Sequence, residues 1–446
     1  MRRGLRRGAW AILAVVLALM PAAGAQAIDI KEVTTPLGIK AWLVEDKSAP
    51  VVALSFSFAG GTASDPDGQL GVTSLMATLL TDGAGPLDAQ AFRRRQEDAA
   101  ASLGFGASLD RLSGTLRVLS ANRDEGFELL RLALSQPRFD PDMVDQRRAQ
   151  TIAGLNQAEQ RPQSVAGRTL MTTLFQGHPY ANNPEGTRED LKSLTPARLK
   201  QRAAVLLVRS GLIVSAVGDI GEGELARQLD RAFGGLVVGI VPPLPLEWKP
   251  PTKPRTVVVE RPVPQSTALM ALPGIARDDP DWYSAVVMNH VLGGGGQQSR
   301  LFNEVREKRG LTYGVSSGLR TYKRAALLVI STASANERVA DAIRVVRAEI
   351  ARMRTEGVTE QELADAKTYL SGALALSLDS SGSVASLMHS LQVDGLSPDH
   401  LVRREALIAA VKLDSVRRVA RRLLREETMT TVVVGKPVGI VSEPKE

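Results

Sequence analysis

The chain of 446 residues contains no cysteine and only four histidines. The absence of cysteine excludes a disulfide framework, an iron–sulfur cluster, a thiolate zinc site and a cysteine nucleophile. The scarcity of histidine restricts metal chemistry further, because imidazole is the commonest metal ligand in proteins. An apolar content of 44% and a charged content of 23% are ordinary for a globular protein and exclude a fibrous or disordered one. The histidines are His178, His290, His389 and His400.

Long apolar runs are also missing after residue 27, so no later segment reaches the roughly 18 residues expected of a membrane span. Near the N-terminus, four arginines precede the apolar run Ala9–Met20, and small residues end at Ala25-Gln26-Ala27. This pattern predicts a secretory signal peptide, residues 1–27, cut after Ala27. An uncleaved anchor and a twin-arginine export route stay open. We expect a periplasmic protein, because a cysteine-free chain suits an oxidising compartment.

The excess of positive charge comes largely from the predicted signal peptide. The whole chain has 55 basic and 48 acidic residues, which gives a net charge of +7. Four of the basic residues and none of the acidic ones fall within residues 1–27, so the remainder is nearly neutral. The basic composition is therefore weak support for nucleic-acid binding, and we expect no nucleic-acid partner.

Proline is concentrated in one short segment. Six prolines fall within residues 242–254, where they exclude a helix or a central strand. Such a segment is typical of a semi-rigid linker. It divides the mature chain into an N-terminal domain, residues 28–241, and a C-terminal domain, residues 255–446.

The two halves resemble each other. Each ends on an apolar strand that closes on Val-Gly, and the two glycines, Gly218 and Gly435, are 217 residues apart. A Ser-Val-Ala triplet occurs at residues 164–166 and again at residues 383–385, an offset of 219. A nearly constant offset indicates an internal duplication, although chance similarity between two mixed halves stays open. The predicted fold class is α+β, in two copies of one domain.

Periodicity and capping place the main elements. Asn336 and Asp414 are expected to cap the helices that follow them. The predicted strands are Val51–Ala59, Leu212–Val217, Thr256–Val259, Ser266–Pro273, Ala326–Ser331 and Met429–Val434, and the predicted helices are Val144–Gln157, Ala340–Met353, Gln361–Leu374 and Ser415–Arg425.

One further helix, Gly71–Thr81, carries apolar residues along one face at the spacing of an amphipathic helix. Its opposite face holds Ser74, Ala77 and Thr78. A strand, a Gly-Gly turn, an acidic loop and then this helix resemble the start of the pitrilysin/insulinase family of zinc peptidases. That family carries H-x-x-E-H on this helix, with two zinc-binding histidines and a glutamate that activates water. Its third zinc ligand is a glutamate about 75 residues later, and the matching position here is Gly154. The resemblance therefore implies a member with no zinc site of its own.

A glycine run, Gly293, Gly294, Gly295 and Gly296, is prominent in the second half. It lacks the Lys-Ser or Lys-Thr of a phosphate-binding loop. Two interpretations stay open: a flexible helix terminus, or a loop over which a peptide passes.

After the glycines, Ser299–Arg309 is predicted to be a helix that Gly310 ends, and Leu311–Val315 is predicted to begin a strand. This run resembles the second-domain signature of the same family. There, an arginine and a tyrosine seven residues later reach the zinc site and contact the substrate and the oxyanion. The matching residues are Arg306 and Tyr313. The alternative is that Arg306 pairs with a nearby acid such as Glu304 or Glu307 and that Tyr313 packs in the sheet.

The resemblance covers residues 30–440 and implies two homologous α/β-sandwich domains. In heteromeric members, such as the mitochondrial processing peptidase, one subunit carries H-x-x-E-H and the other binds substrate. This chain resembles the second kind. We therefore expect a non-catalytic subunit whose Arg306 and Tyr313 complete the site of a zinc-bearing, H-x-x-E-H partner.

Two rival functions follow from the same residues. One is a stand-alone peptide-binding or assembly protein of the bacterial envelope. The other is a hydrolase with a nucleophile at Ser74 or Thr78, which is disfavoured because no histidine lies at a spacing that would activate either hydroxyl.

Overall fold

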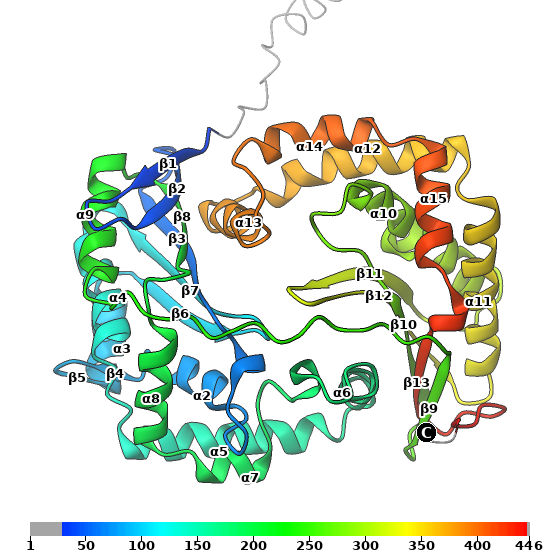
Figure 1. The fold of residues 1–446 in the computed structure, drawn as a ribbon, viewed down its shortest axis with the longest axis horizontal. Helices are drawn as coiled ribbons and strands as arrows, with labels where there is room; N and C mark the ends of the chain where they lie inside the picture. The colour runs from blue at the N-terminus through cyan, green and yellow to red at the C-terminus, as the bar shows by residue number, and fades with distance from the viewer. Residues whose placement is uncertain (1–28, 444–446) are drawn as a thin grey trace, which may run out of the picture.

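The computed structural model describes residues 29–443, except for the side chains of residues 375–377. The predicted signal peptide, residues 1–27, lies outside the described residues. Within residues 29–443, no helix is both long enough and apolar enough to cross a membrane. Residues 29–443 form two large β-sheets, one from each half, which stand on opposite sides of the molecule with helices around and between them (Figure 1).

The first half forms a six-stranded sheet in the order β1-β2-β8-β3-β7-β6. β2 and β8 are parallel, and the other neighbouring strands are antiparallel. A separate two-stranded hairpin joins β4 to β5. The strands are β1 (Lys31–Thr34), β2 (Lys40–Glu45), β3 (Val51–Ala59), β4 (Gly83–Ala84), β5 (Leu87–Asp88), β6 (Ser102–Ala107), β7 (Arg111–Leu119) and β8 (Ile213–Gly218).

The helices of the first half begin at residues that satisfy free backbone groups. Side chains of Asp88, Thr187 and Thr195 accept hydrogen bonds from the first turns of α3, α7 and α8. Proline stands in the first turn of α5, α6 and α8, where no amide hydrogen is required. The helices are α2 (Val72–Leu79), α3 (Ala89–Asp98), α4 (Arg123–Ser135), α5 (Pro141–Ala158), α6 (Pro162–Leu174), α7 (Arg188–Ser193), α8 (Pro196–Leu206) and α9 (Glu222–Phe233).

The second half repeats this plan with a five-stranded sheet in the order β11-β12-β10-β13-β9. Its central strand β10 lies between two antiparallel neighbours, and β13 is parallel to β9, as β8 is to β2 in the first sheet. The duplication predicted from the sequence is therefore present in the fold. The elements are β9 (Arg255–Glu260), β10 (Gln265–Pro273), β11 (Val315–Tyr322), β12 (Ala325–Ala335), β13 (Thr430–Gly435), α10 (Trp282–Asn289), α11 (Val339–Glu356), α12 (Glu360–Ser377), α13 (Ser381–Val393), α14 (His400–Ala409) and α15 (Leu413–Leu423).

The central strand β3 is buried on both faces, because helices cover both sides of the first sheet. Val52, Leu54 and Phe56 point into the core of the first half, where Phe56 meets Phe233 of α9 edge to face at 5.3 Å. The alternate residue Ala53 points to the opposite face and belongs to a separate apolar cluster. A nearly continuous apolar run, rather than a strict alternation, is typical of such a doubly covered strand.

Each half contributes one helix that packs on the sheet of the other half. α13 of the second half packs on the first sheet, where Met388 and Leu391 meet Trp42 and Val217. In return, α6 of the first half packs on the second sheet, in an apolar cluster of Ala166, Leu170, Leu269, Ala271, Val432 and Val434. The repeated Ser-Val-Ala triplets lie in these two exchanged helices. Each inner sheet face is therefore covered by the other half, which binds the halves together (Figure 1).

The linker is pinned at its middle. Residues 234–254 contain neither helix nor strand, and Trp248 inserts into an apolar cluster shared by both halves. Its indole nitrogen donates to the carbonyl oxygen of Leu174 at 2.9 Å, and its backbone nitrogen donates to that of Arg324 at 3.0 Å. The predicted spacer is thus fixed to the first half at α6 and to the second half at the β11–β12 turn.

Several local predictions were wrong. α11 begins after Arg338, and Asn336 instead bonds to Val263 and Ser266. α15 follows Lys412, so Asp414 lies inside its first turn. The predicted helix 299–309 contains a wider π-helical turn, Phe302–Glu307, and the strand predicted from residue 311 begins four residues later. The ends of these helices and of this strand depend on tertiary hydrogen bonds, which local sequence patterns do not predict.

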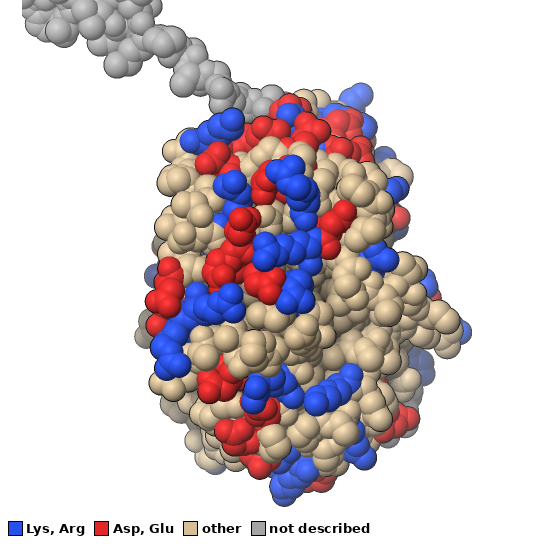
Figure 2. Space-filling model, turned by 90° about the vertical axis from the view of Figure 1, so that its left-hand side faces the viewer, with Lys and Arg blue, Asp and Glu red and all other residues tan. Residues whose placement is uncertain are grey.

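The outer surface of the first half carries charges of both signs, interspersed without a large patch of either (Figure 2). Many are paired across neighbouring helices, as in Arg95–Glu125, Arg123–Glu224 and Arg231–Glu128. Exposed pairs of this kind contribute little stability each. This face therefore has the character of an ordinary solvated surface.

Candidate functional site

The positions that match the family's zinc-binding helix are occupied by groups that are already satisfied or cannot bind a metal. On α2, the Ser74 hydroxyl donates to the carbonyl oxygen of Pro184 at 2.7 Å, and the Thr78 hydroxyl donates to that of Leu75 at 2.8 Å. Ala77 is only 1% exposed. Among residues 29–443, no group of three or more His, Asp and Glu side chains is placed to hold a metal ion.

The fourth matching position, Gly154, lies inside α5, which packs against α2. An added Cβ at Gly154 would meet no atom within 4 Å. The two helices therefore keep the frame of a zinc site without its ligands. Arg147, seven residues before Gly154 on α5, makes a two-point ion pair with the buried Asp82 after α2, with nitrogen–oxygen distances of 2.5 and 2.9 Å.

All four histidines have structural partners. His178 accepts from the backbone nitrogen of Tyr180 at 3.1 Å. His290 is half-buried and stacks on Tyr369 at 4.7 Å, and burial lowers its pKa. His389 bonds to Ser57, and His400 to the Tyr283 hydroxyl, at 2.6 and 2.7 Å.

The glycine run ends the π-helical turn His290–Gly294 that follows α10. Gly293 is buried, and an added Cβ there would stand 2.8 Å from the backbone nitrogen of Ser317 on β11. Gly294 and Gly295 are similarly close to Asn289 and to His290. These three glycines therefore have an internal packing reason to lack a side chain.

Gly296 differs from the other three. It has a φ of +59°, which favours glycine, and a Cβ there would meet nothing within 4 Å. Gly294 is also exposed, but of the four predicted peptide-contact glycines Gly296 is the one with open space where a side chain would stand.

Arg306 lies in the π-helical turn and is partly exposed. Its guanidinium carbon stands over the Phe302 ring, 4.7 Å from the ring centre. The alternative prediction was that Arg306 pairs with a nearby acid. Its contact with Glu307 is loose, because the nearest carboxylate oxygen is 3.8 Å away. Glu304 instead pairs with Lys308 and Arg309 at 2.6 Å each. The cation is thus oriented by an aromatic ring and keeps most of its donors available.

Tyr313 is presented to solvent on a firmly held loop. Its side chain is 83% exposed and lies in a bend before β11, so it does not pack in the sheet. The neighbouring Thr312 is buried, and its hydroxyl donates to the carbonyl oxygen of Ala333 at 2.6 Å. The hydroxyl of Thr332, also buried, bonds to Thr312 at 3.0 Å. The backbone on which Tyr313 stands is therefore fixed by β12.

Arg306 and Tyr313 line one groove of about 430 Å³. The walls come from the turn after the π-helix, the start of β10 and the end of β12. Arg338, which directly precedes α11, also lines the groove, and sequence reasoning missed it. It lies 25 residues after Tyr313, outside the motif, so no local pattern marked it.

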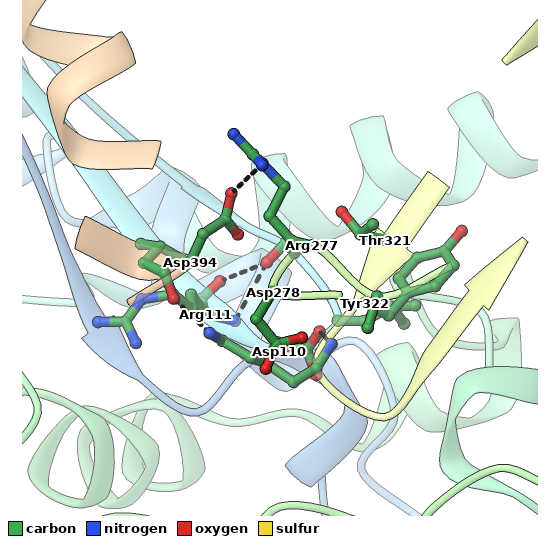
Figure 3. A pocket seen from close by; sticks show the side chains of 12 residues that line it. Asp110, Arg111, Arg277, Asp278, Thr321, Tyr322 and Asp394 are labelled. Carbon is green, nitrogen blue, oxygen red and sulfur yellow. Dashed lines mark hydrogen bonds and ion pairs between the residues drawn. The ribbon is translucent and has the colours of Figure 1, made fainter. Parts of the chain in front are cut away.

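A second cavity of about 390 Å³ lies between the halves and was also not predicted (Figure 3). The tips of the β6–β7 and β11–β12 hairpins meet there. Asp110 accepts from the Tyr180 hydroxyl at 2.5 Å and from the backbone nitrogen of Lys323 at 3.0 Å. Arg277 faces Asp394 at 3.5 Å, and burial raises the pKa of Asp394. Because these charged groups have protein partners, the cavity has the character of a polar contact between the halves.

Two family models match the chain. The model described as "Insulinase (Peptidase family M16)" matches residues 40–188, and the model described as "Peptidase M16 inactive domain" matches residues 193–370. The chain belongs to the insulinase (M16) peptidase family. It is an inactive homologue within that family, which confirms the resemblance inferred from its motifs.

Relatives of the insulinase family agree with this assignment. The chain is 28% identical to the "Non-peptidase homolog YmxG" of Helicobacter pylori, over 74% of this chain and 76% of that protein. It is 27% identical to an uncharacterised zinc protease of Streptomyces coelicolor, over 71% of this chain and 70% of that protein.

Solved structures confirm the two-domain fold. The peptidase M16 inactive domain from Pseudomonas fluorescens superimposes with a TM-score of 0.87 at 28% identity, covering 94% of this chain and 100% of that one. A protease from Helicobacter pylori gives a TM-score of 0.84 at 19% identity, covering 92% and 100%. At that lower identity the likeness shows the fold alone.

Proposed function

We propose that this chain is the non-catalytic, substrate-binding subunit of a periplasmic zinc peptidase. Its partner would be a homologous subunit that carries H-x-x-E-H, the zinc ion and the glutamate base. Arg306 and Tyr313 would reach the partner's site, and the glycine run, above all the open Gly296, would adjoin the path of the peptide.

The observation that carries the proposal is the contrast between two sites. On α2 and α5, the positions that match the family's zinc ligands and base are occupied by Ser74, Ala77, Thr78 and Gly154. The Arg306–Tyr313 groove, in comparison, is open, and its tyrosine is exposed on an anchored loop. A guanidinium and a phenol are suited to stabilise the negative charge that develops when water attacks a peptide carbonyl.

A likeness to a longer protein supports a two-unit assembly. The periplasmic protease PqqL of Escherichia coli superimposes on this chain with a TM-score of 0.78. The match covers 92% of this chain but only 46% of PqqL. A chain of that length has room for a second unit of similar size. Here we propose that the second unit is a separate subunit. The signal-peptide pattern of residues 1–27 supports export to the periplasm.

The test is a peptidase assay on a broad quenched-peptide library. The mature chain is assayed alone and then mixed with an H-x-x-E-H homologue from the same organism, with and without a chelator. We expect no activity alone, and on mixing a chelator-sensitive activity well above that of the partner alone. No gain on mixing would favour the rival function of a stand-alone peptide-binding protein.

The role of Tyr313 is tested in the mixed complex. Tyr313→Phe removes one hydroxyl donor from an exposed side chain, so the fold and the assembly should be unaffected. Loss of a comparable oxyanion donor costs about 3–4 kcal/mol of transition-state stabilisation, so we expect kcat to fall at least about a hundredfold. Tyr369→Phe, at another exposed tyrosine outside the groove, is the matched control and should leave kcat unchanged. An unchanged rate for Tyr313→Phe would contradict the role.

A further inference from the structure

The groove that holds Arg306 and Tyr313 has an excess of positive charge. Its lining residues include two arginines, Arg306 and Arg338, and a single acid, Glu307. The remaining lining residues are uncharged. The side chain of Glu307 is largely in solvent, with 56% of its surface exposed, so it offsets the two cations only weakly.

Neither guanidinium is held by a close ion pair, since the nearest Glu307 oxygen is 3.8 Å from Arg306. Arg306 rests on the Phe302 ring. Arg338 donates from Nη1 to the carbonyl oxygen of Gly310 at 3.1 Å, and it makes no ion pair with any residue in 29–443. Arg344, two turns further along α11, shows the usual alternative, because it pairs with Asp341 one turn before it.

The contact with Gly310 also ties Arg338 to the motif. Gly310 follows the π-helical turn Phe302–Glu307 by three residues, and its backbone nitrogen donates to the carbonyl oxygen of Arg306 at 2.8 Å. It also begins the loop that carries Tyr313. A hydrogen bond at this point places the Arg338 guanidinium beside both residues without using all of its donors. A guanidinium has five N–H donors in a planar fork that matches the two oxygens of a carboxylate.

We propose that the groove binds a carboxylate of the substrate peptide and that Arg338 is the residue that selects it. The carboxylate is either an Asp or Glu side chain or the C-terminal carboxylate, which share the same chemistry. This inference rests on the proposed function, because the groove is the one that would face the scissile bond. It adds a substrate class, acidic peptides, and a selecting residue outside the family motif.

The test measures binding to the mature chain alone by fluorescence anisotropy at low salt. Three N-terminally labelled decapeptides share one Ala/Ser/Gly background. The first has a central Glu and an amidated C-terminus, the second has Gln and an amidated C-terminus, and the third has Gln and a free C-terminus. We expect the first or the third to bind about fivefold more tightly than the second, as suits one exposed charge pair. Which of the two is preferred identifies the source of the carboxylate.

Two variants assign the preference to its residue. Arg338→Gln should remove the preference and leave binding of the neutral peptide unchanged. Arg344→Gln removes the same charge six residues further along the chain, on α11 and outside the groove, and should keep the preference. Equal binding of all three peptides by the unaltered chain, or a preference that survives Arg338→Gln with the thermal stability intact, would overturn the proposal.

The failure of this inference is separable from the failure of the proposed function. The binding assay needs only this chain, whereas the peptidase assay needs the zinc-bearing partner. An active mixed complex with no carboxylate preference would overturn the selection by Arg338 and leave the subunit role standing. A clear preference with no gain in activity on mixing would leave the carboxylate site standing and contradict the subunit role.

Discussion

Single residues decide that α2 and α5 cannot bind zinc, although the helices themselves remain. Ser74 and Thr78 are four apart on α2, and Gly154 lies on the neighbouring α5. Two histidines one turn apart and a glutamate from a second helix form a tetrahedral zinc site with an open fourth position. We therefore predict that the triple variant Ser74→His, Thr78→His and Gly154→Glu binds one zinc ion, measured by calorimetric titration of the metal-free protein.

The double variant without Gly154→Glu is the control for that prediction. Two imidazoles alone should bind zinc at least tenfold more weakly, because one ligand is missing. Equal affinities would mean that Gly154 is not the position that faces the two α2 residues. Ala77 is left unchanged in both variants, since it is buried and a base is needed only for hydrolysis.

At the scale of elements, two glycines in helical segments differ in whether their surroundings leave room for a side chain. Gly293 lies inside the π-helical turn His290–Gly294, against β11, where a Cβ would stand 2.6 Å from the Ser317 hydroxyl oxygen and 2.8 Å from its backbone nitrogen. Gly293→Ala should therefore destabilise the fold by about 1–3 kcal/mol, as overpacking does. Gly154→Ala, in the exposed interior of α5, should stabilise it by up to about 1 kcal/mol.

Denaturant unfolding of both variants measures these two changes against the unaltered chain. Loss of stability in both would mean that Gly154 has a packing role that its open surroundings do not suggest. No loss for Gly293→Ala would mean that the turn can move away from β11.

The same elements show how far local sequence patterns reach. The strand Val51–Ala59 was predicted with its observed bounds, because a run of apolar and small residues between turns is a strong local signal. The π-helical turn Phe302–Glu307 was not predicted, since its wider hydrogen bonds have no periodicity that distinguishes them from an α-helix. Arg306 and Tyr313 were found through a motif. Arg338 joins them only through the packing of α11 against that turn, which local sequence does not encode.

At the scale of the whole molecule, the halves are joined by exchanged helices that local patterns could not predict. The apolar faces of α6 and α13 are visible in the sequence, but nothing local says that each packs on the opposite half. One polar contact accompanies the exchange. His389 of α13 bonds to Ser57 of β3 at 2.6 Å, and Ser57 also accepts from Nε of Arg111. Ser57 can therefore give its own proton to the imidazole, which must be neutral to accept it.

That contact predicts a loss of stability in acid. Burial, assisted by the nearby Arg111 cation, lowers the pKa of His389 to about 4 from an ordinary value of 6.5. Between these values the unfolded chain binds a proton that the folded chain does not, so stability falls as the pH is lowered from 6.5 towards 4 and changes no further below. The full difference corresponds to about 3 kcal/mol. His389→Gln keeps a polar side chain but does not titrate, so its unfolding free energy should lack this part of the pH dependence. Denaturant unfolding of both proteins from pH 4 to pH 7 measures the difference. If the two unfolding free energies change with pH in parallel, His389 is not the source of the acid sensitivity.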